Sequence, residues 1–180
     1  MTLLARKALS DCRLALRLLE DEAQEDVWRV HWAGALALVG VINDILERHK
    51  KTSPIGKVYR KKFDEWKIKA DPSHSIFRDF IKGERNLLLH EYKTNVDVRK
   101  EVEIYLVDER PAYFPSNESE QAPASSEVFM LDQNIFRPMQ SGDWRGEDAR
   151  DVYETALNWW EKQLDEIDAE VVLLCGLQPS

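Results

Sequence analysis

The segment from about Glu25 to Lys50 constrains the fold most, because its middle would be apolar on almost every side of a helix. Apolar residues dominate from Val27 to Leu46, whereas both ends of the segment are polar. A helix of this kind is typical of the buried centre of a helical bundle. Its longest apolar run, Ala33–Ile42, has about half of the ~20 residues that a membrane span requires. We therefore expect a central bundle helix and no membrane span.

Four further segments have the apolar spacing of amphipathic helices. They run from Leu3 to about Glu20, from about Lys57 to Ala70, from about Pro72 to Lys93, and from about Glu147 to Leu174. Pro54 and Gly56 interrupt the pattern, Asp71 is a candidate cap for the following helix, and Gly176 is a candidate helix stop. The pattern predicts an all-α, up-and-down helical bundle of four to five helices, with residues 1–180 forming a single domain.

The region from about residue 97 to 146 departs from the helical pattern. Val102, Ile104 and Leu106 alternate with polar residues, and a second apolar run, "VFML", begins at Val128. The stretch "PSNESEQAPASSE" between them is too polar to bury much surface. We expect a small β-hairpin or loop insertion before the last helix.

Charge and cysteine content restrict the location and the partners of the chain. The net charge is -8, which disfavours general nucleic-acid binding. However, the segment from Arg48 to Lys69 has nine Lys or Arg against two acidic residues, so any polyanion should approach there. Cys12 and Cys175 form no CxxC pair, and Arg6 and Lys7 interrupt the first apolar run. These features indicate a protein of the reducing cytoplasm, without a secretory leader.

The stretch Glu84–Lys93, "ERNLLLHEYK", carries the residues that point to chemistry. On a helix of 100° per residue, Arg85, Asn86 and His90 fall within about 140° of one another, outside the arc that faces the core. Cleavage of RNA by its own 2'-hydroxyl needs a proton acceptor, a proton donor and a cation beside the phosphate. His90 suits either proton role, and Arg85 offers a fork of donors to phosphate. Asn86 could orient the His90 ring or the phosphate.

One chain supplies a single suitable histidine, which suggests that a two-fold homodimer brings two copies of this face together through the Arg85/His90 helix. The apolar side chain of Leu89 on an otherwise polar face is a candidate dimer contact. The basic side chains expected to guide RNA are Lys82, Lys93, Arg60 and Lys61.

The motif "RNLLLHEY" resembles the R-x4-6-H signature of the HEPN superfamily, whose members are helical bundles that often dimerise and cleave RNA without a metal. The Asn after Arg and the Tyr two places after His look like the HepT toxins of toxin–antitoxin systems. The resemblance implies that Arg85 and His90 are catalytic and that Asn86 supports them. It also implies that Tyr92 is a modification site, to which a nucleotidyltransferase antitoxin adds AMP. The insertion at 97–146 departs from the compact HepT pattern.

Two other interpretations remain open. The chain could be a non-catalytic HEPN-like module that binds a nucleotide or a protein, or a structural bundle with an accidental motif. The aromatic residues of Lys57–Lys69 fall on one helical face, so core packing with a solvated basic back competes with RNA binding there. The sequence contains no H-x3-H, E-x-x-H or phosphate-binding glycine motif, and we expect neither a metal nor a cofactor.

Overall fold

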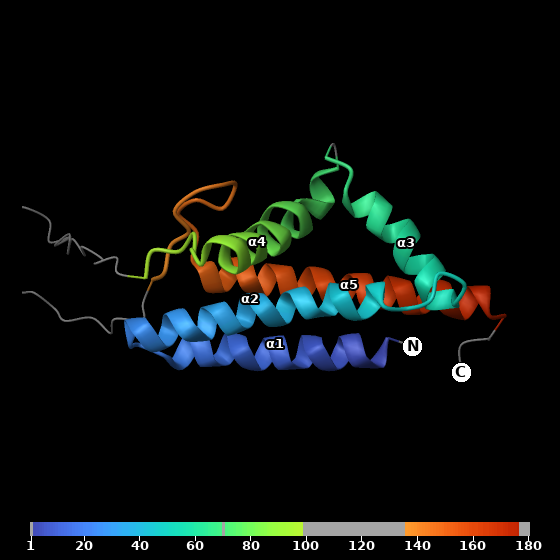
Figure 1. Cartoon of the computed structure of the whole chain (residues 1–180), viewed down its shortest axis with the longest axis horizontal. Helices are drawn as coiled ribbons and strands as arrows, with labels where there is room; N and C mark the ends of the chain where they lie inside the picture. The colour runs from blue at the N-terminus through green and yellow to red at the C-terminus, as the bar shows by residue number, and fades with distance from the viewer. Residues whose placement is uncertain (1, 70, 99–135, 177–180) are drawn as a thin grey trace, which may run out of the picture.

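The computed structural model describes residues 2–69, 71–98 and 136–176, and these are mostly helical (Figure 1). The α-helices are α1 (Leu3–Asp21), α2 (Glu25–Glu47), α3 (Pro54–Trp66), α4 (Lys82–Glu91) and α5 (Ala149–Leu174). A 3₁₀ turn (Pro72–His74) and a π-helix (Ile76–Ile81) lie between α3 and α4. The expected all-α bundle is confirmed for the described residues.

Helices α1, α2 and α5 lie side by side along the long axis, with α1 and α2 antiparallel (Figure 1). Helix α3 and the segment made of the π-helix and α4 form an inverted V above them. Apolar residues of α1, α2, α3, the π-helix and α5 contribute to one buried core cluster, and the partly buried Leu88 of α4 packs against it. The bundle therefore has a layer of three long helices and a second, angled layer that carries the motif.

Helix α2 occupies the predicted central position, but it is not buried on every side. Its large buried side chains include Trp28, Trp32 and Leu46. One stripe nevertheless remains exposed, formed by Val30, Gly34, Ala37 and Val41. Among the described residues, α2 is the one helix long and apolar enough to cross a membrane, and the core helix of a soluble protein satisfies the same criteria.

Aromatic side chains fill the angle between α3, the π-helix and α5. The ring centroid of Trp66 lies 5.0 Å from that of Trp159 and 5.3 Å from that of Phe77. The ring centroids of Trp159 and Trp160 are 4.9 Å apart. The indole Nε1 of Trp66 donates a 2.8 Å hydrogen bond to Oε1 of the buried Gln163. Edge-to-face packing of this kind adds stabilisation to the burial of the rings. The cluster thus anchors the angled layer on α5.

The predicted helix from Pro72 to Lys93 is not one continuous α-helix. Asp71 acts as a cap, accepting a 2.9 Å hydrogen bond from the backbone of Ser73, but it caps the short 3₁₀ turn. The π-helix that follows buries Ile76, Phe77, Phe80 and Ile81. Its i→i+5 bonding suits the spacing i, i+1, i+4, i+5 of these four residues. A regular 100° step consequently applies to α4 and not across its junction with the π-helix.

The segment from 136 to 148 returns the chain to the bundle through two isolated antiparallel bridges, Val96 with Met139 and Pro138 with Asp148. The buried Arg137 donates hydrogen bonds to the carbonyls of Val98 and Ala23. The expected strands at residues 102–106 and from 128 lie outside the described residues.

Candidate functional site

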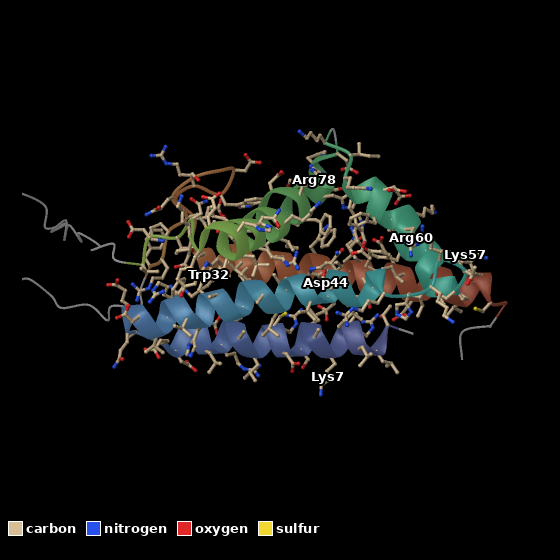
Figure 2. All side chains as sticks on the ribbon, in the orientation of Figure 1. Lys7, Trp32, Asp44, Lys57, Arg60 and Arg78 are labelled. Carbon is tan, nitrogen blue, oxygen red and sulfur yellow. The ribbon has the colours of Figure 1, made fainter. Side chains whose placement is uncertain are left out.

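Arg85 leaves α4 in the direction of α2 and is fixed there by two features. Its Nη2 donates a 3.1 Å hydrogen bond to Oδ2 of Asp44, forming an ion pair in which the side chains are 34% and 39% exposed. The stem of Arg85 crosses α2 at Gly40, whose missing Cβ would lie 2.5 Å from Arg85 Cδ and Nε. Figure 2 shows Asp44 on the part of α2 that runs beneath the inverted V. The guanidinium is therefore held in the seam between α2 and α4, with part of it open to solvent.

Asn86 and His90 lie on the exposed side of α4, as their helical positions predict. Within the described residues, His90 makes no hydrogen bond or ion pair, so its ring is open to solvent and to a ligand. Leu89, which lies between Asn86 and His90 in the sequence, is 55% exposed. Along α4, Arg85 and His90 are separated by about 7.5 Å of rise and about 140° of rotation. One α4 thus presents an exposed imidazole and, about 140° away round the helix, a guanidinium held against α2.

Tyr92 ends α4 in an unusual backbone conformation. Its φ of 50° and ψ of 39° are left-handed, and it is the one described residue other than glycine with a positive φ. The amide of Tyr92 donates to the carbonyl of Leu88 at 3.0 Å, closing the helix. Its side chain is 77% exposed. The phenol is therefore accessible to a modifying enzyme.

The four basic residues expected to guide RNA do not form one group. Lys82 and Lys93 are exposed at the two ends of α4. Arg60 lies on α3, which begins at the opposite end of the long axis from the C-terminal end of α4 (Figures 1 and 2). Its Nη2 donates to the carbonyl of His49, and Lys61 stands 3.5 Å from the carboxylate of Glu170. The α3 residues are thus partly occupied by neighbours and distant from His90.

The basic side of α3 is also less exposed to solvent than the sequence predicts. Lys62 is 6% exposed and its Nζ lies 2.8 Å from Glu166 and 3.1 Å from Glu170 on α5. Burial lowers the pKa of Lys62, but the hydrogen bonds that Lys62 donates to the two carboxylates outweigh this effect and raise the pKa above its usual value. Part of the positive charge of the Arg48–Lys69 segment is therefore used in ion pairs that join α3 to α5.

Near Glu84, α4 borders an acidic hollow of about 310 Å³. Glu84 lines it, is 6% exposed, and accepts a 3.3 Å hydrogen bond from the amide of Asn95. Burial raises the pKa of this carboxyl, and the hydrogen bonds from Asn95 offset the shift in part. Asp79 and Asp143 line the same hollow. Its charge is unsuited to a phosphate.

Sequence reasoning missed Gly40 and Asp44, although one signal was available. Asp44 is the sole acidic residue between Val27 and Leu46, in an otherwise apolar segment, and Gly40 stands one turn before it. Residues at i and i+4 share a helix face. Such a pair in an apolar helix indicates that a polar side chain of another element contacts this face of the helix. It does not identify Arg85 as that side chain.

Within the described residues, no three His, Cys, Asp or Glu side chains converge in a way that could hold a metal ion. No protein-family model, curated protein or solved structure matches the chain.

Proposed function

We propose that the protein is a HEPN-like, metal-independent endoribonuclease of the cytoplasm, acting as the toxin of a toxin–antitoxin or defence system. The observation that carries the proposal is the surface of α4: His90 is exposed and makes no hydrogen bond or ion pair within the described residues, and it lies five residues after Arg85, whose guanidinium is partly exposed. An imidazole available near neutral pH and a nearby fixed cation are what transesterification of RNA requires.

In the proposed reaction, His90 accepts the proton of the ribose 2'-hydroxyl as the 2'-oxygen forms a bond to phosphorus. The bond from phosphorus to the 5'-oxygen breaks, and that oxygen receives a proton from a second imidazole. The products are a 2',3'-cyclic phosphate and a 5'-hydroxyl end. Arg85 contacts the non-bridging phosphate oxygens through its remaining N–H donors, while Asn86 is placed to orient the phosphate or the His90 ring.

The second imidazole comes from a second copy of the chain. Leu89 on α4 is exposed, and so are Val30 and Val41 on α2. Asp44, which pairs with Arg85 of α4, lies within about 60° of Ala37 and Val41 round the α2 helix, so the exposed stripe of α2 borders the seam. An apolar surface with small residues suits helix-to-helix contact with a partner. A two-fold axis beside α4 would place two His90 rings on one cleft.

The proposed regulation acts through Tyr92. An exposed phenol two residues after His90 can accept AMP from a partner nucleotidyltransferase, the proposed antitoxin. The added phosphate and adenine would then obstruct the approach of RNA to His90.

The direct test is cleavage of a labelled RNA in excess EDTA by the wild type and by His90→Ala. We expect the substitution to lower the cleavage rate by about 10²-fold or more, as for loss of a general acid–base group. His49→Ala removes a histidine outside α4 and is the matched control, expected to stay within about twofold. Cleavage that survives in His90→Ala would overturn the assignment of the site.

The competing function is a non-catalytic HEPN-like module that binds a nucleotide or a protein. It is favoured by the Asp44 carboxylate, which offsets the charge of Arg85, and by the net charge of -8. Binding of a nucleotide by the wild type, with no cleavage of any RNA tested, would support this function over the nuclease.

A further inference from the structure

The contact between Arg85 and α2 is closer than an ordinary ion pair between two helices. A Cβ built on Gly40 would lie 2.5 Å from both Cδ and Nε of Arg85 and 3.6 Å from its Cγ. Real Cβ atoms do not approach neighbours at 2.5 Å, so any side chain at position 40 would displace the Arg85 stem. Glycine is the residue that permits such a close approach to a helix backbone.

Asp44 holds the end of the same side chain. It lies one turn after Gly40 on α2, so both residues present the same face to α4. Its carboxylate receives one hydrogen bond, from Nη2 of Arg85. A guanidinium has five N–H donors, so this bond orients the group and leaves other donors for a ligand.

Gly34, on the same helix, provides the contrast. It is also helical, but a Cβ at Gly34 would meet no atom within 4 Å. A Cβ at position 40 would thus require the Arg85 side chain to shift, whereas a Cβ at position 34 would displace nothing. Gly40 is buried, and a glycine within a helix lowers its stability relative to alanine. The Arg85 stem that lies on Gly40 explains why a glycine occupies this position.

We propose that Gly40 and Asp44 are positioning residues that hold the Arg85 guanidinium in the α2–α4 seam, oriented to bind the phosphodiester of an RNA substrate. The inference rests on the proposed nuclease function for the identity of the ligand. A guanidinium fixed at two points loses less conformational freedom when phosphate binds than a free one does. Neither positioning residue takes part in proton transfer.

The test is a double-mutant cycle that combines Gly40→Ala or Asp44→Asn with Arg85→Ala. The probe is a short single-stranded RNA with 2'-O-methyl riboses, which lacks the attacking hydroxyl, and its affinity is measured by fluorescence anisotropy. We expect Gly40→Ala and Asp44→Asn each to weaken binding about tenfold, the scale of one hydrogen bond to a charged group. In the Arg85→Ala background both should have no further effect, because they act through Arg85.

Thermal unfolding supplies a readout that does not depend on RNA. Gly34→Ala should raise the melting temperature, as expected for Gly to Ala in a helix. Gly40→Ala should lower it in the wild-type background and raise it in the Arg85→Ala background, where the stem is gone. Asp44→Asn preserves shape and keeps the binding test decisive if Gly40→Ala folds poorly.

The inference is overturned if Gly40→Ala or Asp44→Asn weakens RNA binding equally with and without Arg85, or if either leaves binding unchanged or strengthens it. Failure of the nuclease proposal looks different. A wild type that binds the RNA, loses affinity in the Gly40→Ala variant and yet cleaves no unmodified RNA would remove the nuclease and leave the positioning pair in place.

Discussion

At the scale of single residues, Tyr92 stores backbone strain at the end of α4. A left-handed conformation costs a residue with a Cβ roughly 1–2 kcal/mol, and glycine avoids most of this cost. The position is the C-terminal end of a helix, where glycine is the common residue.

We predict that Tyr92→Gly is more stable than Tyr92→Ala by about 1 kcal/mol, measured by urea unfolding. The alanine variant is the control, because it deletes the phenol and keeps the strained Cβ. Equal stability of the two variants would show that the left-handed conformation is not maintained in solution.

Glu84 makes stability depend on pH. Burial raises its pKa in the folded protein, with partial compensation from the hydrogen bonds of Asn95. The folded state therefore binds this proton more tightly than the unfolded state, so the contribution to stability falls as pH rises from the unfolded pKa through the folded one. A glutamine side chain does not ionise, so it makes no such pH-dependent contribution to stability.

We expect Glu84→Gln to gain stability relative to the wild type as the pH increases from about 4 to about 7, across the usual range of a carboxyl group and just above it. Urea unfolding at several pH values measures the difference. Parallel pH profiles for the two proteins would contradict the assignment of the titration to Glu84.

At the scale of elements, the N-terminal cap of α5 also bonds the segment that precedes the helix. Asp148 accepts hydrogen bonds from the amide of Arg150 at 2.8 Å and from that of Arg137 at 3.1 Å, and it forms an ion pair with the Arg150 side chain. Burial alone would raise the pKa of Asp148, but these bonds outweigh it and lower the pKa. Asp148 thus fixes both the start of α5 and the chain that enters it.

Asp148→Ala should destabilise the protein by about 2–3 kcal/mol, through loss of a cap and of hydrogen bonds to a charged group. Asp71→Ala is the matched control, since Asp71 caps an exposed 3₁₀ turn and its loss should cost about 1 kcal/mol or less. Chemical denaturation of the two variants makes the comparison, and equal losses would contradict the special role of Asp148.

At the scale of the whole molecule, the proposed nuclease site requires two copies of the chain. Leu89 on α4 and Leu14 on α1 are comparably exposed, at 55% and 49%. Helix α1 lies on the side of the bundle away from α4 (Figure 1). The proposed dimer therefore uses one of these leucines and not the other.

We predict a wild-type dimer in sedimentation experiments, a monomer for Leu89→Asp and a dimer for Leu14→Asp. A buried carboxylate without a partner costs several kcal/mol, enough to separate a modest interface. RNA cleavage should be lost together with the dimer. An active Leu89→Asp monomer would remove the requirement for two His90 rings.

The sequence by itself determined which segments are helical, because apolar spacing is a local property. It did not determine every helix end: α3 runs from Pro54 to Trp66, whereas the pattern predicted about Lys57 to Ala70. The boundaries of α1 and α5 agree with the pattern to within two residues. The exposure of Asn86 and His90 also followed from their positions on a helix wheel. The division of the predicted fourth helix did not follow, because the π-helix depends on packing against the aromatic cluster.

Only the tertiary structure decided which polar groups of the motif are free and which are held. Arg85 is paired with Asp44, 41 residues away along the chain, across a glycine that no motif singles out. The separation of Arg60 and Lys61 from His90 likewise results from the angle between α3 and α4. A local pattern specifies the face of a helix, whereas the partner of that face depends on how distant helices pack.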